Sequence, residues 1–274
     1  MANQPEEHIC KSCGNHFTGL YCNLCGEKVI LPQDRSFRTF LGSILIALTL
    51  ADSKFLRTLW QMIKNPGFIS GEFAEGRRVK YLKPLSVFFV LNLVYFLVPT
   101  IQLFNASLRT QLNSFQSKMI MQRVALKMTE LGFSDVQSFA VLYDQKSMGI
   151  AKMLVILFAV VASLPLNILY RSRNRYFTDH VALSVELVCF NLAINAFLLT
   201  LIMRLTGLGT YIGEVGLTAI FITTNLYFLI RSGIAFYEER GFTLLMKSIF
   251  MIAILKLSLE IYRAILFYVT IWSL

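Results

Sequence analysis

Long apolar stretches constrain the fold of this chain more than any other feature. An α-helix needs about 20 predominantly apolar residues to cross the hydrocarbon core of a bilayer. Only 15% of the residues are charged and 55% are apolar, whereas soluble domains carry about 25% charged residues. The sequence therefore predicts an all-α polytopic membrane protein, and it excludes a soluble globular domain and a disordered chain. The predicted spans are 84–104, 150–170, 180–203, 212–230 and 248–272.

The fifth of these segments is ambiguous. Lys256, Glu260 and Arg263 lie near its middle, at positions i, i+4 and i+7 of one helix face. A charge at mid-bilayer costs several kcal/mol unless it is paired or hydrated. Two interpretations stay open: the three charges neutralise one another, in the membrane or at its surface, or they serve transport. We predict about five spans, with four spans plus one interfacial helix as the alternative.

Basic residues indicate the orientation, because Lys and Arg concentrate in cytoplasmic loops. The net charge is +10, and three basic clusters alternate with the spans. The alternation places the N-terminus in the cytosol and, with five spans, the C-terminus outside. Topology and anionic lipid then explain the positive charge, so no nucleic acid partner is expected. The clusters are Arg77, Arg78, Lys80 and Lys83, then Arg171, Arg173 and Arg175, then Arg231, Arg240 and Lys247. Residues 105–149 contain further basic residues and are predicted to form an outer helical loop, for which the rule weakens.

Four of the five cysteines lie in the motifs CKSCG and CNLCG, with eight residues between the pairs. They are Cys10, Cys13, Cys22 and Cys25. Two Cys-x-x-Cys turns can close a tetrahedral thiolate site, and the glycine after each pair permits a positive φ. Four thiolates suit structural Zn²⁺, whose binding would supply the folding free energy of so short a segment. We predict a cytosolic zinc ribbon over residues 1–30.

Alternatives to zinc are two disulfides or an iron–sulfur cluster. The segment MANQPEEHIC has no basic and apolar regions typical of a signal peptide, so we expect reduced thiols. We expect His8 and His16 to be solvated loop residues, and Cys189 to be a small apolar packing residue. The ribbon lacks a basic, aromatic surface, so its expected partner is a protein rather than a nucleic acid.

A linker, 31–83, joins the ribbon to the transmembrane domain, 84–274. Residues 36–64 alternate apolar stretches with charges, which is typical of interfacial helices, and Trp60 is expected at the headgroup boundary. The NPG sequence at Asn65–Gly67 is predicted to end this helix.

Polar residues inside the spans are the candidate functional residues of the membrane domain. His180, Ser184, Asn191 and Asn195 share one helical stripe, which either lines a hydrophilic path or joins helices by hydrogen bonds. Glu186 lies off this stripe and is expected to pair with Arg171, Arg173 or Arg175. Asn92 and Asn225 are expected to form packing hydrogen bonds. No motif for a nucleophile, a catalytic metal or a bound cofactor is visible, so no catalytic residue is predicted.

Several segments together resemble one bacterial family of zinc-ribbon membrane proteins, catalogued as domain of unknown function three-six-six-seven. The resemblance covers most of the chain and implies a multi-span protein of the bacterial inner membrane whose activity is not established. Relatives carry two more histidines six and eight positions after His180, where this chain has Glu186 and Val188. A histidine cluster therefore cannot be carried over. The resembling segments are CKSCG, CNLCG, FLRTLWQMIKNPGFISGEFAEGRRVKYLKPLSVFF and PLNILYRSRNRYFTDHVALSVELVCF.

Within the resembling run, Arg77 and Arg78 are candidate contacts for lipid phosphates, and Pro84 suits the first turn of a helix. The leading functional hypothesis is a non-enzymatic adaptor, assembly or regulatory factor that engages a protein partner through its ribbon. The alternative is a transporter or channel for a small solute, an ion or a lipid, and an enzyme ranks third. The sequence determines neither the partner nor the oligomeric state.

Overall fold

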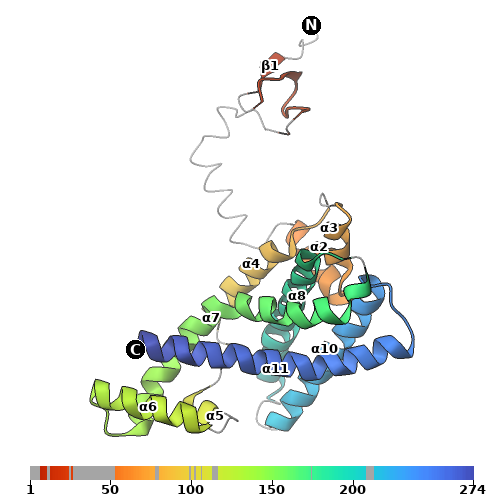
Figure 1. Ribbon diagram of the computed structural model, residues 1–274. Helices are drawn as coiled ribbons and strands as arrows, with labels where there is room; N and C mark the ends of the chain where they lie inside the picture. The colour runs from red at the N-terminus through yellow and green to blue at the C-terminus, as the bar shows by residue number, and fades with distance from the viewer. Residues whose placement is uncertain are drawn as a thin grey trace. The chain divides into compact units, whose positions relative to one another are not determined.

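The computed structural model describes residues 7–10, 13–24, 26, 53–77, 80–98, 100–101, 103–105, 107–112, 117–173, 175–207 and 213–274. The chain divides into two compact units, Met1–Ser53 and Lys54–Leu274, which are drawn in Figure 1. The three-part division expected from the sequence stays a prediction.

The first unit contains a short antiparallel hairpin. Strand β1 (Glu7–Ile9) pairs with β2 (His16–Thr18), with His8 opposite Phe17. Gly14 and Gly26 follow the two cysteine pairs with φ of 73° and 76°. Each glycine N–H donates to the carbonyl of the first cysteine of its pair, Cys10 or Cys22, at 2.9 and 2.8 Å. The glycines of the two CxxCG motifs thus make equivalent backbone hydrogen bonds, as the repeated spacing predicts.

The second unit consists of helices joined by turns and loops, with no strand among its described residues. A π-helical segment, η3, joins α8 to α9, so these three elements form one continuous helix from Phe177 to Thr206. The elements are α2 (Ser53–Lys64), α3 (Phe68–Ala74), α4 (Pro84–Leu97), α5 (Leu108–Leu112), α6 (Ser117–Leu131), α7 (Val136–Leu169), η2 (Arg171–Arg173), α8 (Phe177–Asn191), η3 (Leu192–Leu198), α9 (Leu199–Thr206), α10 (Glu214–Ala235) and α11 (Phe242–Ser273).

Four helices of the described residues are long and apolar enough to cross a membrane: Val136–Leu169, Phe177–Thr206, Val215–Ala235 and Phe242–Ser273. These four helices support a membrane protein, and the count of five spans stays a prediction. The expected first span is shorter than predicted, because α4 has 14 residues and ends at Leu97. Val98 is extended, which is the conformation favoured before a proline. The ambiguous fifth segment, in contrast, lies within the 32-residue helix α11.

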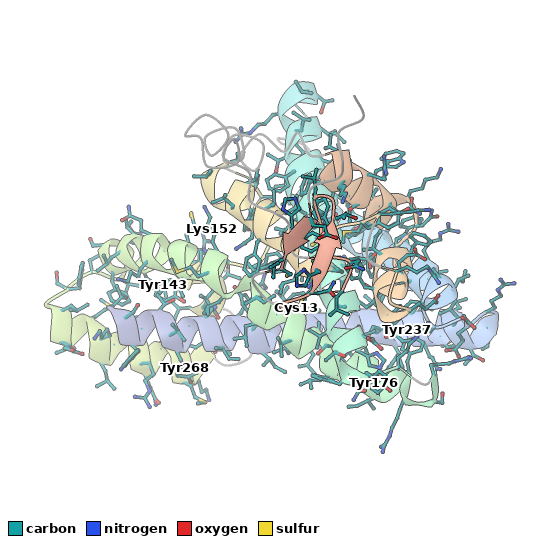
Figure 2. The ribbon with its side chains drawn as sticks, turned by 90° about the horizontal axis from the view of Figure 1, so that it is seen from above. Cys13, Tyr143, Lys152, Tyr176, Tyr237 and Tyr268 are labelled. Carbon is teal, nitrogen blue, oxygen red and sulfur yellow. The ribbon has the colours of Figure 1, made fainter. Side chains whose placement is uncertain are left out.

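Helices α7 and α11 lie side by side along much of their lengths (Figure 1, Figure 2). The hydroxyl of Tyr262 on α11 donates to the carbonyl of Ala151 on α7 at 2.9 Å. A helix of 34 residues, such as α7, is about 51 Å long at about 1.5 Å per residue. Because this exceeds a hydrocarbon core of about 30 Å, an upright α7 would extend beyond it.

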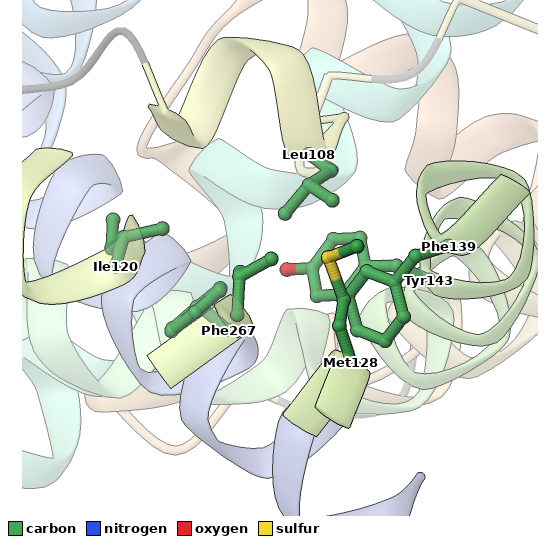
Figure 3. Packing of buried hydrophobic residues seen from close by; sticks show 7 residues of the cluster. Leu108, Ile120, Met128, Phe139, Tyr143 and Phe267 are labelled. Carbon is green, nitrogen blue, oxygen red and sulfur yellow. The ribbon is translucent and has the colours of Figure 1, made fainter. Parts of the chain in front are cut away.

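The residues expected to form an outer helical loop do form helices, α5 and α6, and the loop runs into α7. The hydrophobic cluster formed by α5, α6 and the start of α7 also includes Phe267, which lies near the C-terminal end of α11 (Figure 3). The sequence pattern did not indicate this contact. Asp135 caps α7 by accepting a hydrogen bond from the backbone N–H of Ser138 at 2.9 Å. The buried members of this cluster are Leu108, Ile120, Val124, Met128, Phe139, Tyr143 and Phe267.

Candidate functional site

Three of the predicted metal ligands come together in the first unit. The sulfur atoms of Cys10, Cys13 and Cys22 all lie within 4.8 Å of one another. The sulfurs of Cys13 and Cys22 are 3.6 Å apart, close to the distance of about 3.8 Å between two thiolates bound tetrahedrally to zinc at about 2.3 Å. No disulfide joins these three cysteines to one another or to Cys189, the other described cysteine. The donor set could therefore hold a metal ion, and the fourth predicted ligand, Cys25, lies outside the described residues.

The local fold explains why these sulfurs meet. Cys10 follows β1 and is buried, as are Phe17 on β2 and Cys22, and the three form the small core of the unit. Neither His8 nor His16 belongs to the sulfur cluster. The ring of His8 instead lies 5.8 Å from that of Phe17. An ion here would be held by sulfur alone among the described residues, which is chemistry for folding rather than catalysis.

Removing the metal should unfold the ribbon and leave the helical unit folded. We expect purified protein to carry one zinc ion per chain, and chelation to raise amide hydrogen exchange in residues 7–24 but not in α7. The substitution Cys22→Ser should have the same effect as chelation. Cys189→Ser is the matched control, because Cys189 is buried in α8 and should not change the zinc content. Elemental analysis that finds iron, or no metal, would contradict the assignment.

In the helical unit, Glu186 is fully buried on α8 and accepts three hydrogen bonds, one from the turn before α3 and two from the first turn of α3. The backbone N–H groups of Gly67 and Ser70 donate to its two carboxylate oxygens at 2.9 Å each. The hydroxyl of Ser70 donates to the same oxygen as its own N–H, at 2.5 Å. The carboxylate thus satisfies two N–H groups at the start of α3, which have no partner within a helix.

The same turn packs closely against α10. Gly67 has a φ of 84°, and a Cβ placed on it would lie 2.8 Å from Ser232 Cα and 2.9 Å from Ser232 Cβ. Arg231 on α10 donates to the side-chain carbonyl of Asn65 at 2.8 Å. The NPG turn ends α2 at Lys64, as predicted, and in addition joins α8 to α10. Residues 36–52 of the expected interfacial helix lie outside the described residues.

These contacts correct the expectation that Glu186 pairs with an arginine of the nearby loop. Arg173 instead contacts Glu239 at 3.7 Å, and Arg175 donates to the carbonyl of Phe236 at 3.1 Å. The arginines are near Glu186 along the chain, but the bonds to Glu186 come from residues 116 and 119 positions away. Choosing a partner for Glu186 by closeness along the sequence was therefore wrong.

The deeper part of the polar stripe is hydrogen-bonded between helices. Asn191 on α8 and Asn225 on α10 exchange amide hydrogen bonds of 2.9 and 3.0 Å. Asn195 donates to the Asn191 carbonyl at 2.8 Å and to the Thr224 hydroxyl at 3.0 Å. All three asparagines are buried. This arrangement corresponds to the interhelical bonding interpretation, and the predicted packing role of Asn225 has the same geometry. Asn92 on α4 likewise donates to the carbonyl of Lys152 on α7 at 2.8 Å.

At the other end of the stripe, His180 contacts Tyr237, a tyrosine that the sequence did not single out. Its Nδ1 is 2.7 Å from the hydroxyl of Tyr237, whose ring stacks on Tyr170 at 3.7 Å (Figure 2 labels Tyr237). Burial raises the pKa of Tyr237 above its ordinary value. The ammonium of Lys247 lies 4.9 Å from the Tyr170 ring and 2.9 Å from Glu239. A tyrosine directly after α7, Tyr170, and another just after α10, Tyr237, were the available signal.

The remaining charged candidates form local pairs. Arg263 bonds Glu260 at 3.3 Å, so two of the three charges near the middle of α11 neutralise one another. Lys256 and Glu260 are exposed. Arg77 bonds Glu72 at 2.5 Å and also contacts Glu75. Because the Arg77 hydrogen bond lowers the pKa of Glu72, the pair stays ionised at neutral pH. Arg78 lies outside the described residues, and the lipid-phosphate role of both arginines stays a prediction.

Cys189 is buried, and its sulfur lies 3.7 Å from the carbonyl of Pro84, at the first turn of α4. It packs α8 against α4, which agrees with the role expected for it.

Comparison with known proteins identifies one segment. Residues 52–96 match the family described as "Protein of unknown function (DUF3667)", which confirms the resemblance over α2, α3 and most of α4. The matched segment includes the NPG turn, which is hydrogen-bonded to Glu186 and packs against Ser232. No curated protein and no solved structure matches the chain.

Proposed function

We propose that this protein, whose matched family has no assigned activity, is a membrane-anchored adaptor, assembly or regulatory factor that binds a protein partner through its metal-binding ribbon. One observation carries the proposal. The ribbon is a unit of its own, and it exposes four large apolar side chains that a protein partner would cover. The exposed fractions are 64% for Ile9, 50% for Leu20, 60% for Tyr21 and 71% for Leu24.

The helical unit then serves as the anchor. Glu186, Asn191, Asn195 and Asn225 are buried polar residues of the candidate spans, and their hydrogen bonds are made to other parts of the same unit. Side chains engaged in this way stabilise helix packing, and they favour a scaffold over a conducting path. The proposed location is the inner membrane of a bacterium, with the ribbon in the cytosol.

The partner surface can be tested without unfolding the ribbon. We expect a protein that co-purifies with the intact chain from native membranes to be lost on deletion of residues 1–30. The combined substitution of Leu20, Tyr21 and Leu24 by serine should also lose it, while zinc content stays at one ion per chain. A matched control is Leu126→Ser on α6, because Leu126 is exposed to a similar extent, 66%, in the helical unit. Identical co-purifying proteins for intact and deleted chains would contradict the adaptor proposal.

A transporter or channel is the second candidate. It is favoured by two buried polar atoms on α8 that have no hydrogen-bond partner among the described residues, His180 Nε2 and Ser184 Oγ. Reconstitution in proteoliposomes separates the two functions. The adaptor proposal expects no flux of small solutes or ions. Flux that disappears in a folded variant carrying Asn191→Leu and Asn195→Leu would instead establish the transporter.

A further inference from the structure

His180 and Ser184, at the N-terminal end of the polar stripe, differ from Asn191 and Asn195 in having polar atoms without a hydrogen-bond partner among the described residues. His180 Nε2 and Ser184 Oγ are buried, and neither has a hydrogen-bond partner in the part of the chain that the structure describes. Both residues have an exposed fraction of 0%. Positions i and i+4 of α8 place these two side chains next to each other on one face. Because buried polar groups nearly always have a partner, two adjacent exceptions indicate a ligand.

Many hydroxyl groups of the neighbouring helices donate to a backbone carbonyl, whereas Ser184 on α8, like Ser248 on α11, does not. A serine or threonine in a helix commonly donates to the carbonyl three or four residues before it. Ser163 on α7 does so at 2.7 Å, and Thr270 on α11 does so at 2.7 Å. The hydroxyl of Ser184 makes no such bond, so it is available to a group beside His180.

The contact with Tyr237 assigns the hydrogen on the imidazole ring. If the Tyr237 hydroxyl donates to Nδ1, the neutral ring carries its hydrogen on Nε2, and only that N–H lacks a partner. If Nδ1 donated instead, the hydroxyl hydrogen of Tyr237 would lose this bond and Nε2 would be left as an acceptor without a donor. The first arrangement satisfies more groups. Nε2–H therefore requires an oxygen acceptor, placed where the Ser184 hydroxyl can also reach it.

We propose that an ordered water molecule occupies this position and bridges His180 Nε2 to Ser184 Oγ. Water fits the site for two reasons: it can accept from the imidazole while it bonds the hydroxyl, and it is small enough for a place where both side chains are fully buried. The oxygen of a lipid or quinone has the same acceptor chemistry, but such a molecule needs access to the bilayer. The chain of contacts then runs from Tyr237 through His180 and the water to Ser184, and it links the turn before α11 to α8.

The test is nuclear magnetic resonance of the full-length protein in lipid nanodiscs, with histidine ring nitrogens labelled. The chain has three histidines, so His180→Gln identifies the signal of interest. We expect the His180 ring to carry its hydrogen on Nε2 and to show cross-relaxation with a long-lived water molecule. Ser184→Ala should weaken this signal about fivefold, the equivalent of one lost hydrogen bond of about 1 kcal/mol. Ser163→Ala is the control, because that buried hydroxyl is already bonded, and it should leave the signal unchanged.

Two results would overturn the proposal, and both can be read from the unsubstituted protein. One is a His180 ring with its hydrogen on Nδ1 and no water contact. The other is cross-relaxation of the Nε2 hydrogen with lipid or quinone protons instead of water. Neither result depends on whether a variant folds.

Discussion

Replacing Gly67 with alanine should destabilise the helical unit by more than about 3 kcal/mol, because three costs coincide at this position. An alanine in the left-handed region costs about 1–2 kcal/mol. The new Cβ would lie 2.8 Å from the backbone of Ser232, and backbone shifts of this kind typically cost about 1–3 kcal/mol. Any shift also weakens the hydrogen bond from the Gly67 N–H to Glu186.

Thermal unfolding in nanodiscs measures the effect. The melting temperature should fall by roughly 6–12 °C, taking about 2–4 °C per kcal/mol for a unit of this size. Gly76→Ala is the matched control. Gly76 has nearly the same φ, 83°, but a Cβ added to it would meet nothing within 4 Å, so only the backbone cost applies. Equal effects of the two substitutions would show that the approach of the turn to α10 is unimportant.

Replacing Glu186 with glutamine should also destabilise the helical unit, by about 2–4 kcal/mol, although the side chains have the same shape. The carboxylate accepts from Gly67 N, Ser70 N and Ser70 Oγ. A glutamine amide has one oxygen and one NH₂ group. In either orientation, its NH₂ group faces a backbone N–H of the turn, so two donors are opposed and one buried N–H loses its acceptor.

Hydrogen exchange locates this effect, since α3 should lose protection while the end of α7 near Tyr143 keeps it. Ser70→Ala is the milder comparison, because it removes one of the three bonds and leaves both backbone bonds in place. A Glu186→Gln variant as stable as the parent, or more stable, would mean that Glu186 is already protonated and that the donor count does not decide stability.

Local sequence spacing predicted the features that depend on neighbouring residues. The two CxxCG motifs fix similar backbone turns at Gly14 and Gly26, because a positive φ after a cysteine pair is a property of a few residues. The NPG sequence ends α2 for the same reason. Positions four and seven apart share a face in any α-helix, so the part of the stripe on α8, from His180 to Asn191, could be recognised without a structure, and Asn195 follows it in η3.

Hydropathy alone was less reliable for helix length. It extended the first span through residue 104, since the residues after Leu97 are mostly apolar and uncharged, whereas Val98 leaves the helix before Pro99. It also left α11 in doubt, because Glu260 and Arg263 count as two charges in a hydropathy average. Their contact at 3.3 Å reduces the cost of both.

By itself, the sequence determined that the chain is helical and suited to a membrane, that four cysteines are spaced for one metal, and that a helix ends at the Asn65–Gly67 turn. The tertiary structure alone decided what that turn is for. Glu186 was assigned to the nearest arginines, but its donors are Gly67 and Ser70, and His180 meets Tyr237, 57 residues further along. Helix periodicity sets which face of a helix a residue occupies. The packing of segments far apart in the sequence sets which group lies opposite that residue, and a buried charge is satisfied only by the group that lies opposite it.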